Sequence, residues 1–330
     1  MSWLSKAIDA GGDNRYGLDD IEDSLFLTSG NRYAKTSQFW MLLVLASVIA
    51  AGGVVSDSTP AVIGAMIVAP LATPIYGVAL ATVTGARRDL LASLLLLIEG
   101  IAVNVLIGFL VGMFSIARMP LDSNPQITGR TAPTLLDLGI AITVGVAGSF
   151  ALVRRDVSNI LAGVAIAISL VPVLAVVGIT LGSGRLDLAW GAFVLFLVNA
   201  AAIIVAGVVV FGAAGYAKLA IDRGRLPGRR AKVLIALFVL ALLVPLGVAS
   251  LRTLRYEQWI GATDTAARQW VRGTGWRVED VNQVAGDIVI KTIGPGSSPP
   301  IAGLRSAVRA HVPRNITVNV VEDSGRTTGL

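Results

Sequence analysis

Residues 58–85 carry the sequence STPAVIGAMIVAPLATPIYGVALATVTG, which contains no charged side chain and is long and apolar enough to cross a bilayer. Two prolines, Pro70 and Pro74, interrupt it. A proline has no N–H, and its ring clashes with the carbonyl four residues earlier, so the carbonyls of Met66 and Pro70 are expected to lose their helical partners. We therefore predict that this segment crosses the membrane as a broken helix.

The break allows two interpretations. Free backbone groups inside hydrocarbon are tolerated only where protein or a water-filled cavity covers them. A kink repaired by neighbouring helices meets that condition without any function. A functional break meets it too, because a polar solute then contacts the free groups. Two prolines four residues apart, with Thr73 between them, support the two interpretations about equally.

The composition excludes a soluble globular protein. The chain has 330 residues, of which 54% are hydrophobic and 15% charged, and its mean hydropathy is +0.74; soluble proteins have about 25% charged residues. We expect a multi-pass protein of the plasma (cytoplasmic) membrane, with membrane lipids as partners. The net charge is +6, but the basic residues are distributed among the loops in the way that sets membrane orientation, so no nucleic-acid partner is expected.

Residue types that carry catalysis are scarce. Cysteine is absent, which excludes a disulfide framework, a thiolate metal site and a cysteine nucleophile. The single histidine, His311, lies outside every apolar segment, whereas an intramembrane serine protease needs such a base. An aspartyl protease needs two aspartates deep in the membrane, a pattern that the apolar segments lack. We expect no enzyme activity, no metal site and no cofactor.

Seven apolar segments are long enough to span a bilayer, at 39–56, 60–84, 90–114, 135–153, 157–181, 187–212 and 231–250. When the loops are assigned to alternate sides, twelve Lys and Arg residues fall on one side and five on the other. By the positive-inside rule, the N-terminus is cytoplasmic and the C-terminal tail lies outside. Residues 1–38 form the cytoplasmic N-terminal segment, whose helical spacing of apolar residues predicts a short amphipathic helix starting near Asp19.

An internal repeat relates two parts of the transmembrane domain, which covers residues 39–250. A shift of 98 residues superimposes Pro74 on Pro172, Thr82 on Thr180, Arg87 on Arg185 and Asp89 on Asp187. Repeat one covers 39–114 and repeat two covers 135–212, each with three spans, and the helix at 231–250 stands outside both. Because each repeat has an odd number of spans, the second enters the membrane from the opposite side, which predicts an inverted-topology pair.

Residues 251–330 have a different pattern, which predicts a small separate domain. Helices are expected over 256–271 and 301–308, and strands over 276–281, 287–293 and 316–320. The predicted fold is therefore an all-α polytopic membrane protein with seven transmembrane helices and an inverted 3+3 repeat. A small extracytoplasmic α+β domain of order α-β-β-α-β follows, for which we expect a scaffold or assembly role.

Glu99 is the only acidic residue deep inside a predicted span. It lies roughly 15 Å into its helix, near the middle of a bilayer core that is about 30 Å thick. A carboxylate at that depth is costly, so one interpretation is an ion ligand or a proton-carrying group. The other is a protonated or paired structural glutamate at a helix interface, and the sequence does not separate the two.

Four further candidates lie in the segment of the second repeat that matches the broken segment of the first, and Pro172 is one of them. Pro172 is expected to free the carbonyl of Ile168, and the polar side chains of Asn159 and Ser169 lie in the same segment. The second break has one proline instead of two, so the two halves need not contribute equally to a pathway.

Asn104 and Asn199 lie inside the third predicted helix of each repeat. They are candidates for binding a solute or for hydrogen bonding between helices. Asn104 belongs to the stripe Gly100, Asn104, Gly108 and Gly112, whose spacing of four lets another helix approach closely. That stripe favours a packing role for Asn104, and small-residue stripes of this kind lead us to expect a homo-oligomer.

The stretches that carry a family resemblance are LASVIA at residues 45–50, AVIGAMIVAPL at residues 61–71, then Pro74-Ile75 and Gly77. Together they resemble the uncharacterised hydrophobic-domain family named domain of unknown function 389, over about residues 39–212. The resemblance implies a prokaryotic integral membrane protein. It supplies no agreed substrate, so no site residue is carried over from it.

The leading functional hypothesis is a transporter or channel-like protein that moves a small ion or polar solute between the two repeats. The broken segments around Pro70–Pro74 and Ser169–Pro172 would supply free carbonyls and half-helix ends, and Glu99 would provide coupling. The alternative is a non-transporting membrane scaffold or envelope sensor, in which the breaks serve packing and the outer domain acts.

Overall fold

The computed structural model describes residues 14–115, 121, 124–131, 135–157, 170–225, 255, 258–284, 287–295, 298–313 and 316–323. The chain divides into two compact units, 1–247 and 248–330, and each is described by itself. The predicted span at 231–250 and the beginning of the span at 157–181 lie outside the described residues. So do three candidate residues, Asn159, Ile168 and Ser169.

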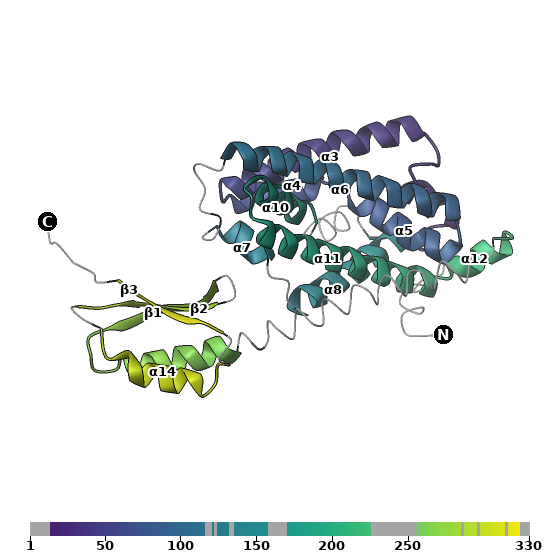
Figure 1. Ribbon diagram of the computed structural model, residues 1–330. Helices are drawn as coiled ribbons and strands as arrows, with labels where there is room; N and C mark the ends of the chain where they lie inside the picture. The colour runs from purple at the N-terminus through teal and green to yellow at the C-terminus, as the bar shows by residue number, and fades with distance from the viewer. Residues whose placement is uncertain are drawn as a thin grey trace. The chain divides into compact units, whose positions relative to one another are not determined.

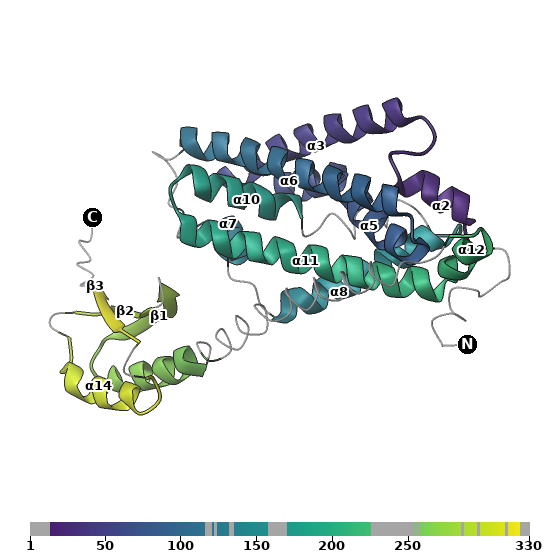
Figure 2. The same ribbon diagram turned by 45° about the vertical axis from the view of Figure 1, so that its right-hand side comes forward.

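The first unit is helical, and its long helices lie side by side (Figures 1 and 2). The described helices are α2 (Leu18–Leu25), α3 (Arg32–Val55), α4 (Thr59–Val68), α5 (Ala72–Thr84), α6 (Arg87–Ser115), α7 (Pro125–Thr131), α8 (Leu135–Val153), α10 (Val171–Gly182), α11 (Leu186–Ala213) and α12 (Tyr216–Asp222). Of these, α3, α6, α8 and α11 are long and apolar enough to cross a membrane, and α4 with α5 makes a fifth span if the bent pair is taken together. The described residues thus contain four or five of the seven predicted spans.

The broken helix is present. α4 and α5 meet at an angle of 44°, and α4 ends at Val68, just before Pro70. The helix stops there because Pro70 has no N–H to donate to the carbonyl of Met66. Pro74 acts differently from the prediction, since it lies in the first turn of α5, where an N–H has no helical acceptor in any case. The two prolines therefore produce one break and one helix start.

The helix bounds recur along the chain. α5 and α10 begin 99 residues apart and end 98 residues apart, and the same offsets separate α6 from α11. α3 and α8 also end 98 residues apart. The packing recurs too, because α10 packs on α6 while α5 packs on α11. Each short helix therefore contacts the long helix that follows the other short helix.

Glycines set the distance between α6 and α10. A Cβ atom at Gly178 would lie 2.6 Å from the backbone nitrogen of Phe109, and one at Gly108 would lie 2.6 Å from the carbonyl oxygen of Ala175. The obstacle at both positions is backbone, which cannot turn aside as a flexible side chain can. The stripe of small residues on α6 thus lets another helix approach closely, as predicted.

Gly178→Ala is expected to destabilise the protein by about 1–3 kcal/mol, because the added methyl group forces two backbones apart. The control is Gly139→Ala in α8, where a Cβ atom meets nothing within 4 Å and where alanine favours the helix by up to about 1 kcal/mol. Thermal unfolding midpoints in detergent measure both effects. Equal midpoints for the two variants would contradict this account of the packing.

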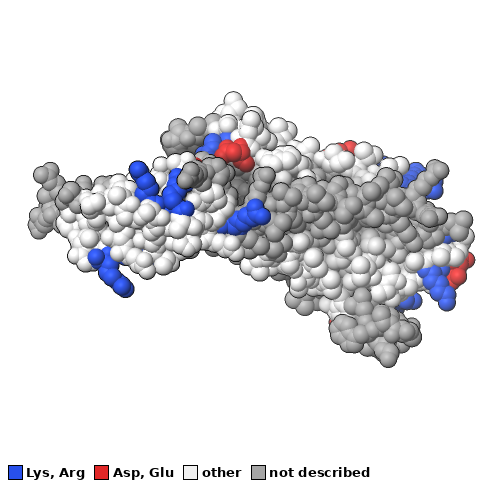
Figure 3. Space-filling model, turned by 60° about the horizontal axis from the view of Figure 1, so that its bottom comes forward, with Lys and Arg blue, Asp and Glu red and all other residues white. Residues whose placement is uncertain are grey.

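The N-terminal helix α2 covers one end of the helical unit, near α12 (Figure 2). Its apolar face is buried through Leu18, Ile21 and Leu25, as predicted for an amphipathic helix near Asp19. Its acidic face forms four ion pairs with three segments, namely Asp19 with Arg223 (2.6 Å), Asp20 with Arg155 (3.1 Å), Glu22 with Arg225 (2.5 Å) and Asp23 with Lys35 (2.8 Å). Figure 3 shows acidic and basic side chains together at this end of the helical unit.

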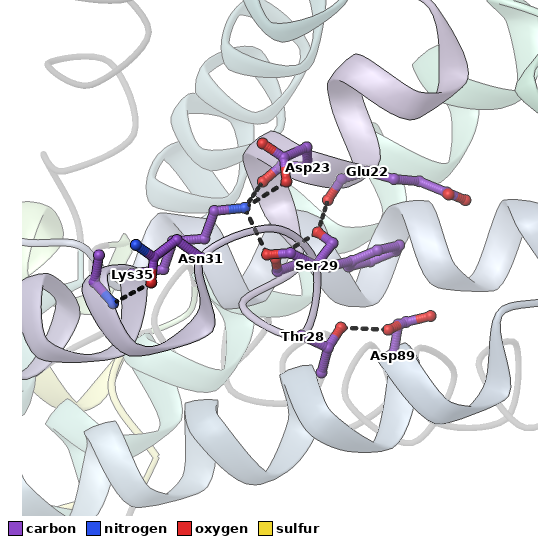
Figure 4. Close-up of polar contacts among 9 residues, drawn as sticks. Glu22, Asp23, Thr28, Ser29, Asn31, Lys35 and Asp89 are labelled. Carbon is purple, nitrogen blue, oxygen red and sulfur yellow. Dashed lines mark hydrogen bonds and ion pairs between the residues drawn. The ribbon is translucent and has the colours of Figure 1, made fainter.

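Further hydrogen bonds strengthen the attachment of this N-terminal segment. The N–H of Tyr16 donates to the carbonyl of Val153 over 2.9 Å, and the hydroxyl of Tyr216 donates to the carbonyl of Tyr16 over 2.9 Å. On the side of α3 and α6, the hydroxyl of Thr28 donates to the carboxylate of Asp89 over 2.5 Å (Figure 4). The segment therefore contacts α6, α8 and α12.

Acidification is expected to release α2. The hydrogen bond from Arg223 holds the pKa of Asp19 below its ordinary value of 3.8, so the pair stabilises docking above that value and is lost as pH falls through the lowered pKa. Amide hydrogen exchange of residues 18–25, expressed relative to the intrinsic exchange rate at each pH, is therefore expected to rise between about pH 7 and about pH 3. Asp19→Asn is expected to raise exchange at neutral pH and to reduce the change on acidification. Unchanged exchange in all conditions would show that the ion pairs do not hold α2.

The second unit is a small α+β domain. A helix over 258–270 precedes β1 (Arg277–Val284) and β2 (Asp287–Ile293), and α14 (Ile301–Arg309) precedes β3 (Val318–Asp323). β2 lies in the middle of the sheet, antiparallel to β1 and parallel to β3. The core includes Ile288 and Ile290 from the sheet and Leu304 and Val308 from α14. The predicted order α-β-β-α-β is confirmed.

Candidate functional site

The break between α4 and α5 corrects one prediction about free carbonyls. The carbonyl of Pro70 was expected to lack a partner, but it accepts a hydrogen bond from the N–H of Thr73 over 3.1 Å. The turn at Pro70 is tight enough for a bond that spans three residues instead of four. The carbonyl of Met66 cannot receive the usual helical bond, because the residue four positions later is proline. The break thus leaves fewer unsatisfied carbonyls than the sequence indicated.

Contacts along α6 show where α5 begins. A Cβ atom at Gly100 would lie 2.9 Å from the side chain of Leu71, the residue just before α5. Further along α5, a Cβ atom at Gly77 would lie 2.6 Å from the hydroxyl of Ser93. Residue numbers rise along α5 as they fall along α6. α5 therefore runs antiparallel to α6 and starts near Gly100.

The same face of α6 also shows where α10 begins. Gly108 lies against Ala175, and a Cβ atom at Gly112 would lie 2.8 Å from the Cα atom of Ile179. Along this face the residue numbers of α6 and α10 rise in the same direction, so α10 runs parallel to α6. One turn before Gly108 lies Asn104, which is therefore level with the first turn of α10 at Val171. α5 and α10 start on either side of this level and run apart in opposite directions.

Asn104 is fully buried, with 0% of its surface exposed. Neither its amide nitrogen nor its amide oxygen has a hydrogen-bond partner among the described residues. An unsatisfied polar group inside a protein costs about 1–3 kcal/mol. Gly100 and Gly108, one turn before and one turn after, provide the close packing. Asn104 makes no hydrogen bond to another helix among the described residues, and the choice between packing and solute binding for this residue stays a prediction.

Asn199 lies on α11, and 4% of its surface is exposed. α11 follows α10 through a short turn and packs beside it, so it runs back in the direction of α5. A Cβ atom at Gly207 would lie 2.8 Å from the Cβ of Ala79. Two turns earlier on α11, Asn199 is therefore close to the level at which α5 begins. The two candidate asparagines come from the corresponding long helices of the two halves.

The remaining described candidates fall into two groups. Thr73, Pro74 and Pro172 lie in the first turns of α5 and α10, so they belong to the region around Asn104. Glu99 does not. It is exposed and lines a separate cavity of about 270 Å³, together with Thr28, Arg32 and Asp89 near the beginnings of α3 and α6. The structure thus brings Asn104 together with the helix starts and turns Glu99 toward the end that carries α2.

Two features of this region were not predicted from the sequence. One is the place of Pro74 and Pro172 in the first turns of α5 and α10; half-helix ends were predicted here, and the preference of proline for a first turn was the available signal. The other is the contribution of Arg32 and Asp89 to the cavity that Glu99 lines, for which the sequence offers no signal, because the contact joins segments far apart in the chain. Among the described residues, no group of three or more acidic or histidine side chains is placed to hold a metal ion.

A curated relative is an uncharacterized protein of the archaeon Methanocaldococcus jannaschii, which is 30% identical over 196 residues. The alignment covers 59% of this chain and 60% of the relative, so the chain spans less than two thirds of that protein. No solved structure matches the chain.

The family comparison covers the region just described. Its matched residues, 66–205, run from the end of α4 through α5, α6, α8 and α10 into α11. Asn104, Asn199 and both helix starts lie inside this range. Residues 66–205 match the family described as a domain of unknown function, DUF389, and the resemblance predicted from the sequence is therefore confirmed.

Proposed function

We propose that the protein is a membrane transporter or channel-like protein for a small ion or polar solute, with its site formed by the broken helices between two inverted repeats. The observation that carries the proposal is the pair of helix starts, α5 and α10, inside an apolar unit beside the buried amide of Asn104. Helices that begin inside a membrane place polar backbone groups where a solute can reach them.

The inverted repeat is supported by position and by direction. The bounds of α5, α6, α10 and α11 recur with offsets of 98 and 99 residues. α5 runs antiparallel and α10 runs parallel to the same helix, α6. Opposite directions are what a unit of three spans and its inverted copy require.

Orientation and partners follow from charge and from the exposed surface. The basic residues that pair with α2 lie at one end of the unit, which by the positive-inside rule is cytoplasmic in a multi-pass plasma-membrane protein. The C-terminal unit then lies outside. On α6, Leu91, Leu95, Ile98 and Leu106 are exposed, and these apolar side chains are suited to lipid or to a second copy in a homo-oligomer.

One observation favours a second function. The C-terminal unit has its own core and forms a compact unit separate from the helices. A membrane scaffold or envelope sensor acts through such a domain, and there the break in the helical unit has a packing role alone.

Flux across proteoliposomes distinguishes the two functions. The protein is reconstituted and screened with ions and small polar solutes of both charges. Pro70→Ala restores an N–H for the carbonyl of Met66 and favours a continuous helix, so flux is expected to fall by about tenfold or more, equivalent to about 1.4 kcal/mol. Pro74→Ala is the matched control, because the N–H that this substitution introduces lies in a first turn and has no helical acceptor. The flux of this variant is expected to stay near that of the wild type.

The outcomes separate clearly. Absence of flux across the whole panel, with the protein correctly folded in the vesicles, would favour the scaffold. Equal flux in the two proline variants would show that the solute passes elsewhere.

Glu99→Gln tests coupling. If the carboxylate at the cavity beside Arg32 and Asp89 exchanges protons during transport, the glutamine variant is expected to lose the dependence of flux on a pH gradient and to keep passive exchange. Asp57→Asn, in the loop between α3 and α4, is the control and is expected to keep the dependence. A pH response that survives in Glu99→Gln would remove Glu99 from the coupling step.

A further inference from the structure

We infer that the region between the starts of α5 and α10 binds a small anion, with the amide nitrogen of Asn104 as a donor. The inference names the class of solute for the proposed transporter and rests on that function for its biological meaning. The binding site itself stands on four observations about charge and hydrogen bonding.

The first observation is the polarity of the two helix starts. α5 has 13 residues and α10 has 12, so each has a full helix dipole, equivalent to about half a positive charge at its N-terminus. Residues Leu71 and Leu170 precede the helices, and neither side chain caps its helix. No acidic residue lies in either first turn. The positive ends are therefore not neutralised by the helices that carry them.

The second observation is direction. α5 runs from its start toward Ser93, and α10 runs from its start toward Gly112, both along one face of α6. The two N-termini therefore point toward a common level. Two positive helix ends directed at one place in an apolar unit attract an anion and repel a cation.

The third observation is the amide of Asn104 at that level. It is fully buried, and its nitrogen and oxygen both lack a hydrogen-bond partner among the described residues. A buried unsatisfied amide costs free energy and persists where a ligand completes it. Its NH₂ group is a donor for an anion. At the two helix starts, the N–H groups of Ala72 and Val171 have no acceptor within their own helices, whereas the N–H of Thr73 already donates to Pro70.

The fourth observation concerns the ligands that a cation would need. A cation at a helix break is held by free carbonyls; of the two carbonyls that the prolines affect, that of Pro70 already accepts from Thr73, which leaves that of Met66 at the end of α4. The nearest acidic side chain on α6, Glu99, is exposed and lines the separate cavity with Arg32. The region around Asn104 therefore combines donors and positive helix ends without a described carboxylate.

Binding to the full-length protein in detergent tests the inference without requiring transport. Thermal unfolding is followed with sodium salts of chloride, nitrate, phosphate and acetate against sodium gluconate at equal ionic strength. In a second series, lithium, potassium and choline gluconate replace sodium gluconate. At least one small anion is expected to raise the unfolding midpoint in a saturable manner, by about 2 °C or more. The choice of cation is expected to make no difference.

Two asparagine variants separate a ligand donor from a structural amide. Asn104→Leu removes an unsatisfied polar group, so it is expected to raise the midpoint without anion and to abolish the shift caused by the anion. Asn124→Leu is the matched control, because the buried amide of Asn124 donates to the carbonyl of Val54 over 2.9 Å and accepts from the N–H of Gln126 over 2.8 Å. That variant is expected to lower the midpoint and to keep the shift.

Each outcome decides one question. A midpoint that responds to cations and not to anions, or an anion shift of equal size in Asn104→Leu and the wild type, overturns the inference. No saturable shift with any anion also overturns it. Saturable anion binding that depends on Asn104, in a protein that shows no flux in vesicles, supports the inference and removes the proposed transport.

Discussion

A backbone N–H or C=O group in the core of a bilayer has no water to bind, and this constraint determines most of the helical unit. A continuous helix satisfies these groups with its own hydrogen bonds. Where a helix stops inside the apolar unit, the local structure must therefore satisfy or cover the backbone groups that the helix leaves without partners. At Pro70 the arrangement is a tight turn, in which Thr73 donates to the proline carbonyl. At the starts of α5 and α10, prolines occupy positions whose N–H groups have no helical acceptor.

The short helices then require a long helix that they can approach closely. α6 provides it with one face on which glycine recurs every fourth residue, contacting Leu71 before α5 and then Ala175 and Ile179 of α10. Asn104 interrupts that row at the level where both short helices begin. The polar residue and the helix starts are thus consequences of one arrangement, since the face that admits two helix backbones also holds the amide between their ends.

Much of this architecture could be predicted from the sequence, because the relevant signals are local. Proline in an apolar segment predicted the break, charge and periodicity predicted α2, and alternation predicted the order of the C-terminal domain. The hydrogen bond that the Pro70 carbonyl accepts could not be predicted, because it depends on the geometry of the turn. The direction of Glu99 could not be predicted either, since α6 is apolar nearly all round and its periodicity does not distinguish a lipid-facing side from a buried one. The role of Asn104 depended on whether a neighbour satisfies its amide, which only the packed structure describes.

The attachment of α2 has a consequence for motion. Its carboxylates contact Lys35 at the start of α3, Arg155 after α8, and Arg223 and Arg225 after α12. If one half tilts relative to the other at this face, several of these pairs must separate together, or α2 must leave with one half. Each exposed pair alone contributes only about 0.2–1 kcal/mol. Because the pairs break together, the free energy of such a tilt depends more steeply on ionic strength than the free energy of any single pair. The short acidic helix α2 therefore links the start of α3 to the residues that follow α8 and α12.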